Sequence, residues 1–265
     1  MSGTHMLEAV LRREKAIMVG VMATLLIFSW GYMLYMASEM PCTSSGSAIS
    51  TTHAHGWGIP DFLMAFVMWA VMMIGMMVPS VAPWVLALCG ISARNPKAGP
   101  LFSAGGFLMG YLAVWTAYSF LAAGLQWGLH TITLLSPQLR GASPAPEGAL
   151  LLIAGVYQWT PAKNACLIHC RSPLGFFLTS WKEGRFGSFL MGFQHGLYCV
   201  GCCWALMALS FVAGLMNLLW MAAITIFVLI DHTTLVGYWF TRATGALLIG
   251  SGIWMLAVTL IKGSV

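Results

Sequence analysis

Soft metal ligands recur along one face of a single apolar segment of this sequence. The segment Phe186–Leu215 contains no charged residue, and as a helix it is long enough to cross the ~30 Å hydrocarbon core of a bilayer. Helical spacing places Met191, His195, Cys199 and Cys202 on one stripe of this segment, with Cys203 at its edge. Thioethers, imidazoles and thiolates together suit Cu(I), whereas imidazoles and thiolates also suit Zn(II). The stripe therefore predicts a metal site, with Cu(I) favoured and zinc as the alternative.

A second group of candidate ligands lies in the segment Tyr157–Pro173. If this segment is helical, Cys166 and Cys170 share a face and His169 lies beside them. Two thiols and an imidazole form part of a ligand set for Zn(II) or Cu(I), but the two thiols could instead cycle with a disulfide. Cys199 should lie about 20 Å from the inner membrane boundary. The two groups can therefore form one site only if the segment folds back into the bundle.

Methionines and histidines elsewhere extend the pattern. On the second apolar run, Met68, Met72 and Met76 recur at every fourth residue, and they could relay Cu(I) or form a packing surface. Before that run, His53 and His55 could capture a metal ion, or they could simply be solvated loop histidines. We therefore regard these residues as candidate stations on a path rather than as a complete site.

An acidic residue followed by a histidine, Asp231-His232, interrupts the sixth apolar run. Burying an acid beside a titratable imidazole in a membrane costs free energy unless the acid is paired with a cation or hydrated. Alternatively, the helix simply ends at this point. The sequence leaves both interpretations open.

The composition excludes an ordinary soluble domain. Of the 265 residues, 59% are hydrophobic and 7% are charged, compared with roughly 25% charged in typical chains. The net charge of +5 is spread thinly between apolar runs, which does not fit nucleic-acid binding. Five of the seven cysteines fall in two clusters, unlike a secreted disulfide framework. The chain also lacks an ATPase or nucleotide-binding motif. These features predict an integral membrane protein.

The apolar runs predict an all-α, polytopic transmembrane bundle of six or seven helices. With the N-terminus inside, ten of the twelve Lys and Arg residues are cytoplasmic, and only Arg140 and Lys262 are outside. The positive-inside rule therefore favours this orientation in a bacterial-type cytoplasmic membrane. We expect residues 1–15 to form a cytoplasmic segment and residues 16–262 a single membrane domain. The first six residues could derive from a cloning vector, so they carry no weight in this interpretation.

Three motifs make the chain resemble a known family. They are WAVMMIGMMVPS at Trp69–Ser80, YQWTPAKNACLIHCRSP at Tyr157–Pro173 and HGLYCVGCCWALM at His195–Met207. The order and spacing of these motifs, over about residues 57–232, resemble those of the DUF2182 family of predicted metal-binding integral membrane proteins. The resemblance implies a helical membrane protein with a metal site at Cys166, Cys170, Cys199, Cys202 and Cys203. Relatives tend to carry Glu-Lys where this chain has Asp231-His232, so the role of that position is open here.

Together these features favour a membrane protein that binds a soft metal, most simply copper, and transfers or delivers it. In this hypothesis the loop histidines capture the ion, the methionines relay it, and the cysteines with His195 hold it. The expected partners are membrane lipid, other membrane subunits or a metallochaperone, and not nucleic acid. Two alternatives remain. One is a structural or assembly subunit of a larger membrane complex, and the other is a membrane thiol oxidoreductase.

Overall fold

The structure is a computed structural model that describes residues 2–39, 58–92, 99–131, 144–182, 184–213, 217–233 and 237–263. Every element in these ranges is an α-helix. The helices are α1 (Ser2–Glu39), α2 (Ile59–Ser92), α3 (Pro100–Thr131), α4 (Pro144–Tyr157), α5 (Pro161–Arg171), α6 (Pro173–Ser180), α7 (Gly184–Ala208), α8 (Ser210–Ala213), α9 (Leu218–Thr233) and α10 (Gly237–Gly263). His53 and His55, the predicted capture residues, lie outside the described residues.

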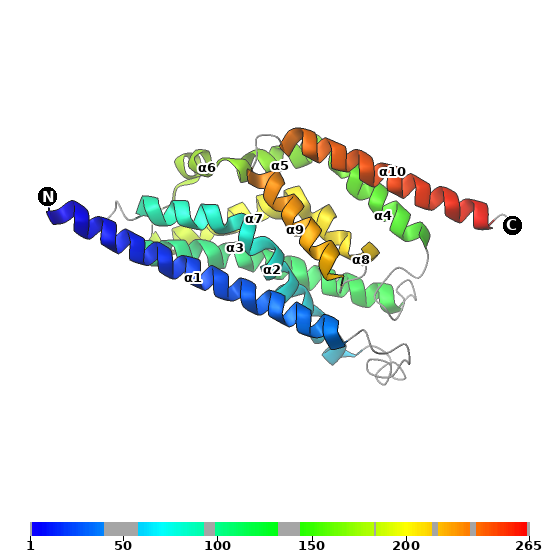
Figure 1. Cartoon of the computed structure of the whole chain (residues 1–265), viewed down its shortest axis with the longest axis horizontal. Coiled ribbons are helices and arrows are strands. Elements are labelled where there is room, and N and C mark those ends of the chain that lie inside the picture. The colour runs from blue at the N-terminus through cyan, green and yellow to red at the C-terminus, as the bar shows by residue number, and fades with distance from the viewer. Residues whose placement is uncertain are drawn as a thin grey trace.

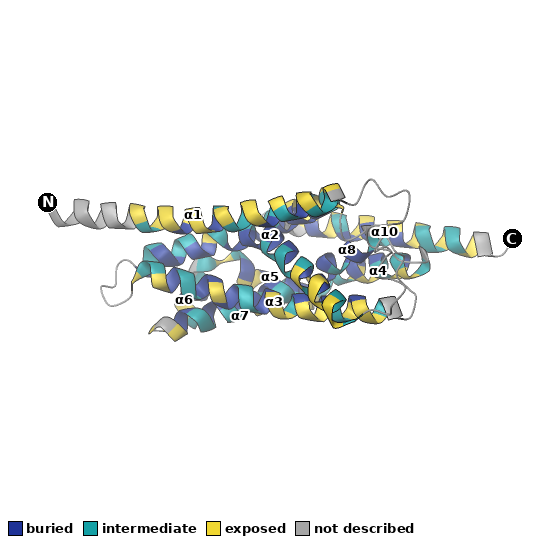
Figure 2. Ribbon diagram, turned by 90° about the horizontal axis from the view of Figure 1, so that it is seen from below, coloured by how far each residue is buried: buried dark blue, intermediate teal, exposed yellow. Residues whose placement is uncertain are grey.

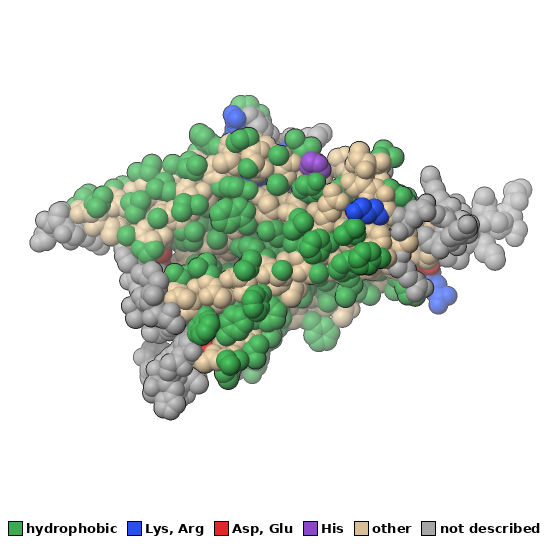
Figure 3. Space-filling model, turned by 180° about the vertical axis from the view of Figure 1, so that it is seen from behind, with side chains coloured by type: hydrophobic (Ala, Val, Ile, Leu, Met, Phe, Trp, Pro, Cys, Tyr) green, Lys and Arg blue, Asp and Glu red, His purple; other side chains and the backbone are tan. Residues whose placement is uncertain are grey.

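Five of these helices, α1, α2, α3, α7 and α10, are long and apolar enough to cross a membrane. Two shorter apolar helices, α4 and α9, bring the number of apolar helices in the described ranges to seven. The predicted all-α, polytopic class is therefore confirmed. Hydrophobic side chains dominate the face shown in Figure 3, as expected for a surface in contact with lipid. The second apolar run does not end at its prolines, because α2 continues through Pro79 and Pro83.

The core of the bundle lies between α2, α3 and α7. In this core α3 packs against both α2 and α7, while α1 covers the outer side of α2 and α10 pairs with α4. Exposed residues line the outer side of α1, and α7 is the most deeply buried of the five long helices (Figure 2). The helix that carries the predicted ligand stripe therefore lies at the centre of the protein.

The segment between α4 and α7 folds back onto the bundle. Helix α4 ends at Tyr157, and α5 begins at Pro161 after an N-cap at Thr160, whose side chain accepts a hydrogen bond from the Lys163 amide. Proline at the first helical position loses no hydrogen bond there, so this short sequence both stops one helix and starts the next. Helix α5 then packs against α7 and α9. This return of the chain is the condition under which the two cysteine groups can meet.

Glycines allow α3 and α7 to cross with their backbones in contact. A Cβ atom on Gly192 would lie 1.9 Å from the Phe107 carbonyl oxygen, and one on Gly110 would lie 2.0 Å from the Phe189 carbonyl oxygen. At Gly196, a Cβ would lie 3.0 Å from the Val114 side chain, also on α3. Gly192 and Gly196 form a small-xxx-small pair, and this spacing allows the close helix approach.

Replacing Gly110 with alanine should destabilise the protein by at least about 1–3 kcal/mol, because the new methyl group meets a backbone carbonyl that cannot rotate away. Gly105 is the matched control on the same helix, because a Cβ there would have no atom within 4 Å. Thermal unfolding of the detergent-solubilised variants measures the difference. Equal unfolding temperatures for Gly110→Ala and Gly105→Ala would contradict the crossing.

Candidate metal centre

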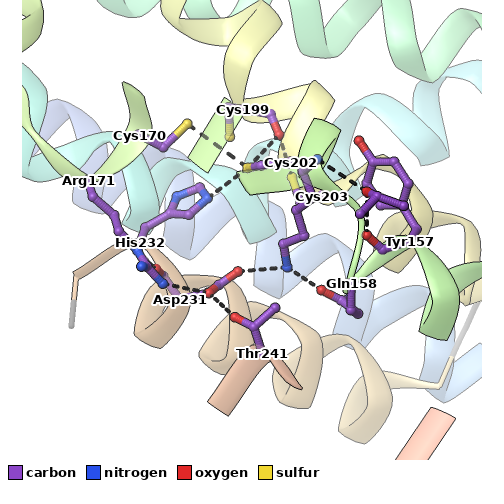
Figure 4. Close-up of polar contacts among 12 residues, drawn as sticks. Tyr157, Gln158, Cys170, Arg171, Cys199, Cys202, Cys203, Asp231, His232 and Thr241 are labelled. Carbon is purple, nitrogen blue, oxygen red and sulfur yellow. Dashed lines mark hydrogen bonds and ion pairs between the residues drawn. The ribbon is translucent and has the colours of Figure 1, made fainter. Parts of the chain in front are cut away.

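Four thiols and one imidazole converge from three helices in the protein interior. Two groups of potential ligands each have all their ligand atoms within 4.8 Å of one another. One group is Cys170 of α5, Cys202 of α7 and His232 of α9, and the other is Cys199, Cys202 and Cys203 of α7. All five side chains are buried, with no more than 6% of their surface exposed. Figure 4 shows Cys170 and His232 facing Cys202 from two different helices.

Cys202 belongs to both groups and connects them. Its sulfur lies 4.0 Å from the Cys170 sulfur and 3.1 Å from Nε2 of His232. It also donates a hydrogen bond of 3.1 Å to the Cys199 carbonyl, which accepts a second one of 2.8 Å from Cys203. Two thiolates that bind one ion at about 2.3 Å in trigonal geometry lie about 4 Å apart. The separation of the Cys170 and Cys202 sulfurs therefore suits a shared ion.

A buried tyrosine connects the thiols to α2 and α3. The Tyr111 hydroxyl lies 3.2 Å from the Cys199 sulfur and 3.2 Å from the Ser80 hydroxyl. Tyr111 and Ser80 are themselves buried, so these contacts are formed away from solvent. A hydroxyl that can donate to a sulfur would orient Cys199 and stabilise its thiolate.

A buried ionic network lies immediately beside the thiols. Asp231 accepts from Nζ of Lys163 at 2.9 Å, from Nη2 of Arg171 at 3.1 Å, and from the Thr241 hydroxyl at 2.5 Å. Lys163 is fully buried, and its ammonium also donates to the Gln158 side chain. Figure 4 shows Asp231 between Arg171 and Thr241, next to His232 in the chain. The network fixes the end of α9 against α5 and α10, and with it the position of the imidazole.

The charges of this network are unbalanced. Two cations, Lys163 and Arg171, share the single carboxylate of Asp231, so the network carries one excess positive charge beside the thiols. A nearby positive charge favours thiolate over thiol. On α5, contacts with the Cys199 and Cys202 thiols, together with burial, raise the pKa of Cys170 well above its usual value. A metal ion that binds Cys170 as a thiolate must therefore displace a proton.

The predicted ligands His195 and Cys166 lie outside both groups. His195 is buried, and its ring stacks on Trp84 with 3.9 Å between centroids. Cys166 is half-buried, and its sulfur packs against Gly201. A Cβ atom added to Gly201 would lie 2.7 Å from that sulfur. Burial, and then the nearby Cys202, raise the pKa of the Cys166 thiol. The structure thus joins four of the five predicted cysteines directly and places Cys166 beside them.

The predicted methionine stripe runs from the surface of α2 into the core. Met68 is half-buried, whereas Met72 and Met76 are almost completely buried. Met64, one turn earlier, is 67% exposed. This burial fits a packing surface and also a route for an ion into the bundle. The role of the stripe in metal binding stays a prediction.

Two residues of the site were not predicted as such. His232 was not among the predicted ligands, and Lys163, predicted to be cytoplasmic, has a fully buried side chain in α5. One signal was present in each case, namely a charged or titratable residue within or beside an apolar run. Here both interpretations of Asp231-His232 hold, because α9 ends at Thr233 and both side chains are buried.

A bundle of apolar helices with buried thiols and an imidazole at its centre defines a polytopic membrane protein with a candidate soft-metal centre. The family model of PpoB2, described as a copper chaperone, matches residues 66–255, and the chain belongs to this family. The matched range includes every residue of the two ligand groups. A comparison with curated proteins and one with solved structures found no match. The family is copper-related, in agreement with the metal-binding character expected from the three motifs.

Proposed function

We propose that this protein is a membrane-embedded copper chaperone that holds Cu(I) as its cargo at Cys170, Cys202 and His232. The observation that carries the proposal is the convergence of these side chains from α5, α7 and α9 inside the region matched by the copper-chaperone family. A thiol pair and an imidazole are soft donors that suit Cu(I). Structural zinc sites instead use four ligands, so zinc is the weaker candidate.

Cys202 gives the centre a way to pass its cargo on. Because Cys202 belongs to both ligand groups, an ion can exchange Cys170 and His232 for Cys199 and Cys203 while Cys202 holds it. Each exchange replaces one soft ligand by another over a few ångströms, so the ion never becomes uncoordinated in the bilayer. Stepwise exchange of this kind is what transfer requires, whereas a storage site would need only one closed group.

The ionic network supports a monovalent cargo. Cu(I) bound by two thiolates carries a charge of −1, and the neighbouring Lys163, Arg171 and Asp231 together carry a charge of +1. Opposite charges in a buried site offset part of the cost of removing each from water. The loaded centre with its network is therefore electrically neutral.

The remaining predictions complete this proposal. We place the protein in a cytoplasmic membrane with residues 1–15 inside and residues 16–262 as one domain. Lipid surrounds the bundle, and a metallochaperone or another membrane subunit exchanges copper with it. In this scheme His53 and His55 capture the ion, and the methionine stripe of α2, from Met68 to Met76, relays it. The half-buried start of that stripe at Met68 and its buried end at Met76 support the relay.

Anaerobic purification followed by Cu(I) titration against a competing chelator tests the proposal. We expect at least one Cu(I) per chain, bound tightly enough to protect the cysteines of the centre from a small alkylating reagent, because thiolates bound to metal do not alkylate. Mass spectrometry of the alkylated protein identifies the protected residues. No bound copper with fully reduced thiols would favour the structural-subunit alternative. A Cys170–Cys202 disulfide that forms regardless of copper would favour the oxidoreductase.

A further inference from the structure

His195 belongs to neither ligand group of the thiol centre, and its surroundings are unusual for a buried imidazole. Only 2% of its surface is exposed, and Nδ1 has no hydrogen-bond partner among the described residues. A buried polar atom without a partner carries a desolvation cost, so natural proteins rarely keep one without a reason. The deepest part of α7 therefore presents a free ligand atom that the proposed cargo site does not use.

Aromatic rings surround this imidazole. The Trp84 ring lies 3.9 Å from it with an interplanar angle of 31°, and the rings of Phe107 and Tyr111 stack within 6 Å at angles of 28° and 25°. Phe176 approaches edge-on at 5.8 Å. The only oxygen on these rings, the Tyr111 hydroxyl, contacts Ser80 and Cys199 rather than this imidazole, and the other rings carry no hydrogen-bond acceptor of the carboxylate or carbonyl kind. Their faces do attract cations, and indole attracts them most strongly.

The geometry points to a second Cu(I) station formed by His195 and Trp84, which we propose as separate from the thiol centre. An ion held at Nδ1 lies in the plane of the imidazole. At a 3.9 Å separation of the two ring centroids, an ion about 2 Å from Nδ1 would lie within the ~6 Å over which an indole face attracts a cation. Cation–π attraction would then add to the bond from nitrogen.

Soft ligands flank this station along α7. Met191 lies one turn before His195 and Cys199 one turn after it, and both are buried. Four residues of helix advance about 6 Å, a short step for an ion that exchanges ligands. The inference rests on the proposal that the chain carries copper, and it adds a position next to the thiol centre on the same helix.

The donor set determines which ions fit. The imidazole and the indole are neutral, as is the flanking thioether of Met191, so none of them can offset a second positive charge in a low-dielectric interior. The station should therefore take the soft monovalent ions Cu(I) and Ag(I) and reject Zn(II). The thiol centre differs in this respect, because its thiolates can also compensate a divalent ion.

Titration of the purified full-length protein with Ag(I) separates the two positions. The ultraviolet absorbance of silver–thiolate bonds reports the thiol centre, and quenching of Trp84 fluorescence reports the station. Trp84→Phe identifies the share of the signal that comes from this one of twelve tryptophans. In the native protein we expect the absorbance to saturate first, and one further equivalent to quench Trp84. Zn(II) should leave the Trp84 fluorescence unchanged.

His195→Phe removes the nitrogen and keeps a ring in the aromatic cluster. We expect this variant to keep the silver–thiolate absorbance (the absorbance phase) and to lose the quenching of Trp84 (the quenching phase). It should also bind one equivalent less of Ag(I). His169→Phe is the matched control, since His169 also stacks on an aromatic ring, that of Tyr198 at 4.2 Å, but is exposed; it should keep both phases. If His195→Phe does not fold, His195→Gln provides the same comparison.

Three results would overturn the station. They are a single phase in the native protein, quenching that survives in the folded His195 variants, and equal quenching by Zn(II). Loss of the absorbance phase alone, with quenching retained, would instead contradict the thiol centre and leave the station supported. The two proposals can therefore fail independently.

Discussion

Replacing Cys202 with serine should lower Cu(I) affinity by more than about 100-fold, because changing a residue that only orients a ligand already costs ~10–100-fold. Cys202 is the one residue shared by the two ligand groups found in the described part of the chain. Its loss leaves neither group with three ligand atoms within 4.8 Å of one another.

The size of this effect should depend on the position of each cysteine. Cys203→Ser removes a ligand from only one group, so the group of Cys170, Cys202 and His232 still binds, and the loss should be several-fold at most. Cys89 is buried on α2 and belongs to neither group, so Cys89→Ser should bind Cu(I) like the native protein. Competition with a Cu(I) chelator gives the affinities, and gel filtration confirms that each variant is folded. Equal affinities for Cys202→Ser and Cys89→Ser would exclude the centre as described.

The local part of this site could be predicted from the sequence. Helical periodicity alone places Met191, His195, Cys199 and Cys202 on one stripe of α7, and all four are buried. The crossing at Gly192 also has a local cause, because a small residue at this position is what permits the close approach. Properties that depend on a single helix can be read from its own residues.

The partners of that stripe could not be predicted in the same way. Cys170 reaches Cys202 because the chain breaks between Tyr157 and Pro161 and turns α5 back against α7. The sequence contains the break, but the direction of α5 after the break depends on packing against two other helices. The sequence also did not show which histidine faces the thiols. His195 shares the stripe with the thiols yet faces aromatic rings, whereas His232, on a different helix, faces Cys202.

Asp231→Asn should destabilise the protein more than any other single change in the ionic network, by about 3–5 kcal/mol, the range seen when one partner of a buried ion pair is removed. The carboxylate of Asp231 pairs with both Lys163 and Arg171, and its side chain is 4% exposed. Its loss leaves two cations without an acid, and Lys163 is completely buried. Lys163→Met should be milder, because Asp231 keeps Arg171 and Thr241.

The double variant Lys163→Met/Asp231→Asn should be more stable than Asp231→Asn alone, because Lys163→Met removes the buried cation that Asp231→Asn leaves without its acid. Contacts that acted independently would instead make the double variant the least stable of the three. Asp61→Asn is the control, since Asp61 has a half-buried side chain and accepts a hydrogen bond of 2.9 Å from the Gly58 amide at the start of α2. The asparagine oxygen can still accept this bond, so the variant should lose only the charge near the helix N-terminus and cost less than about 1 kcal/mol. Thermal unfolding in detergent ranks the four variants. If the double variant unfolds at the lowest temperature, the network is held by hydrogen bonds rather than by its charge balance, and its role as the counter-charge of the Cu(I)–thiolate complex is wrong.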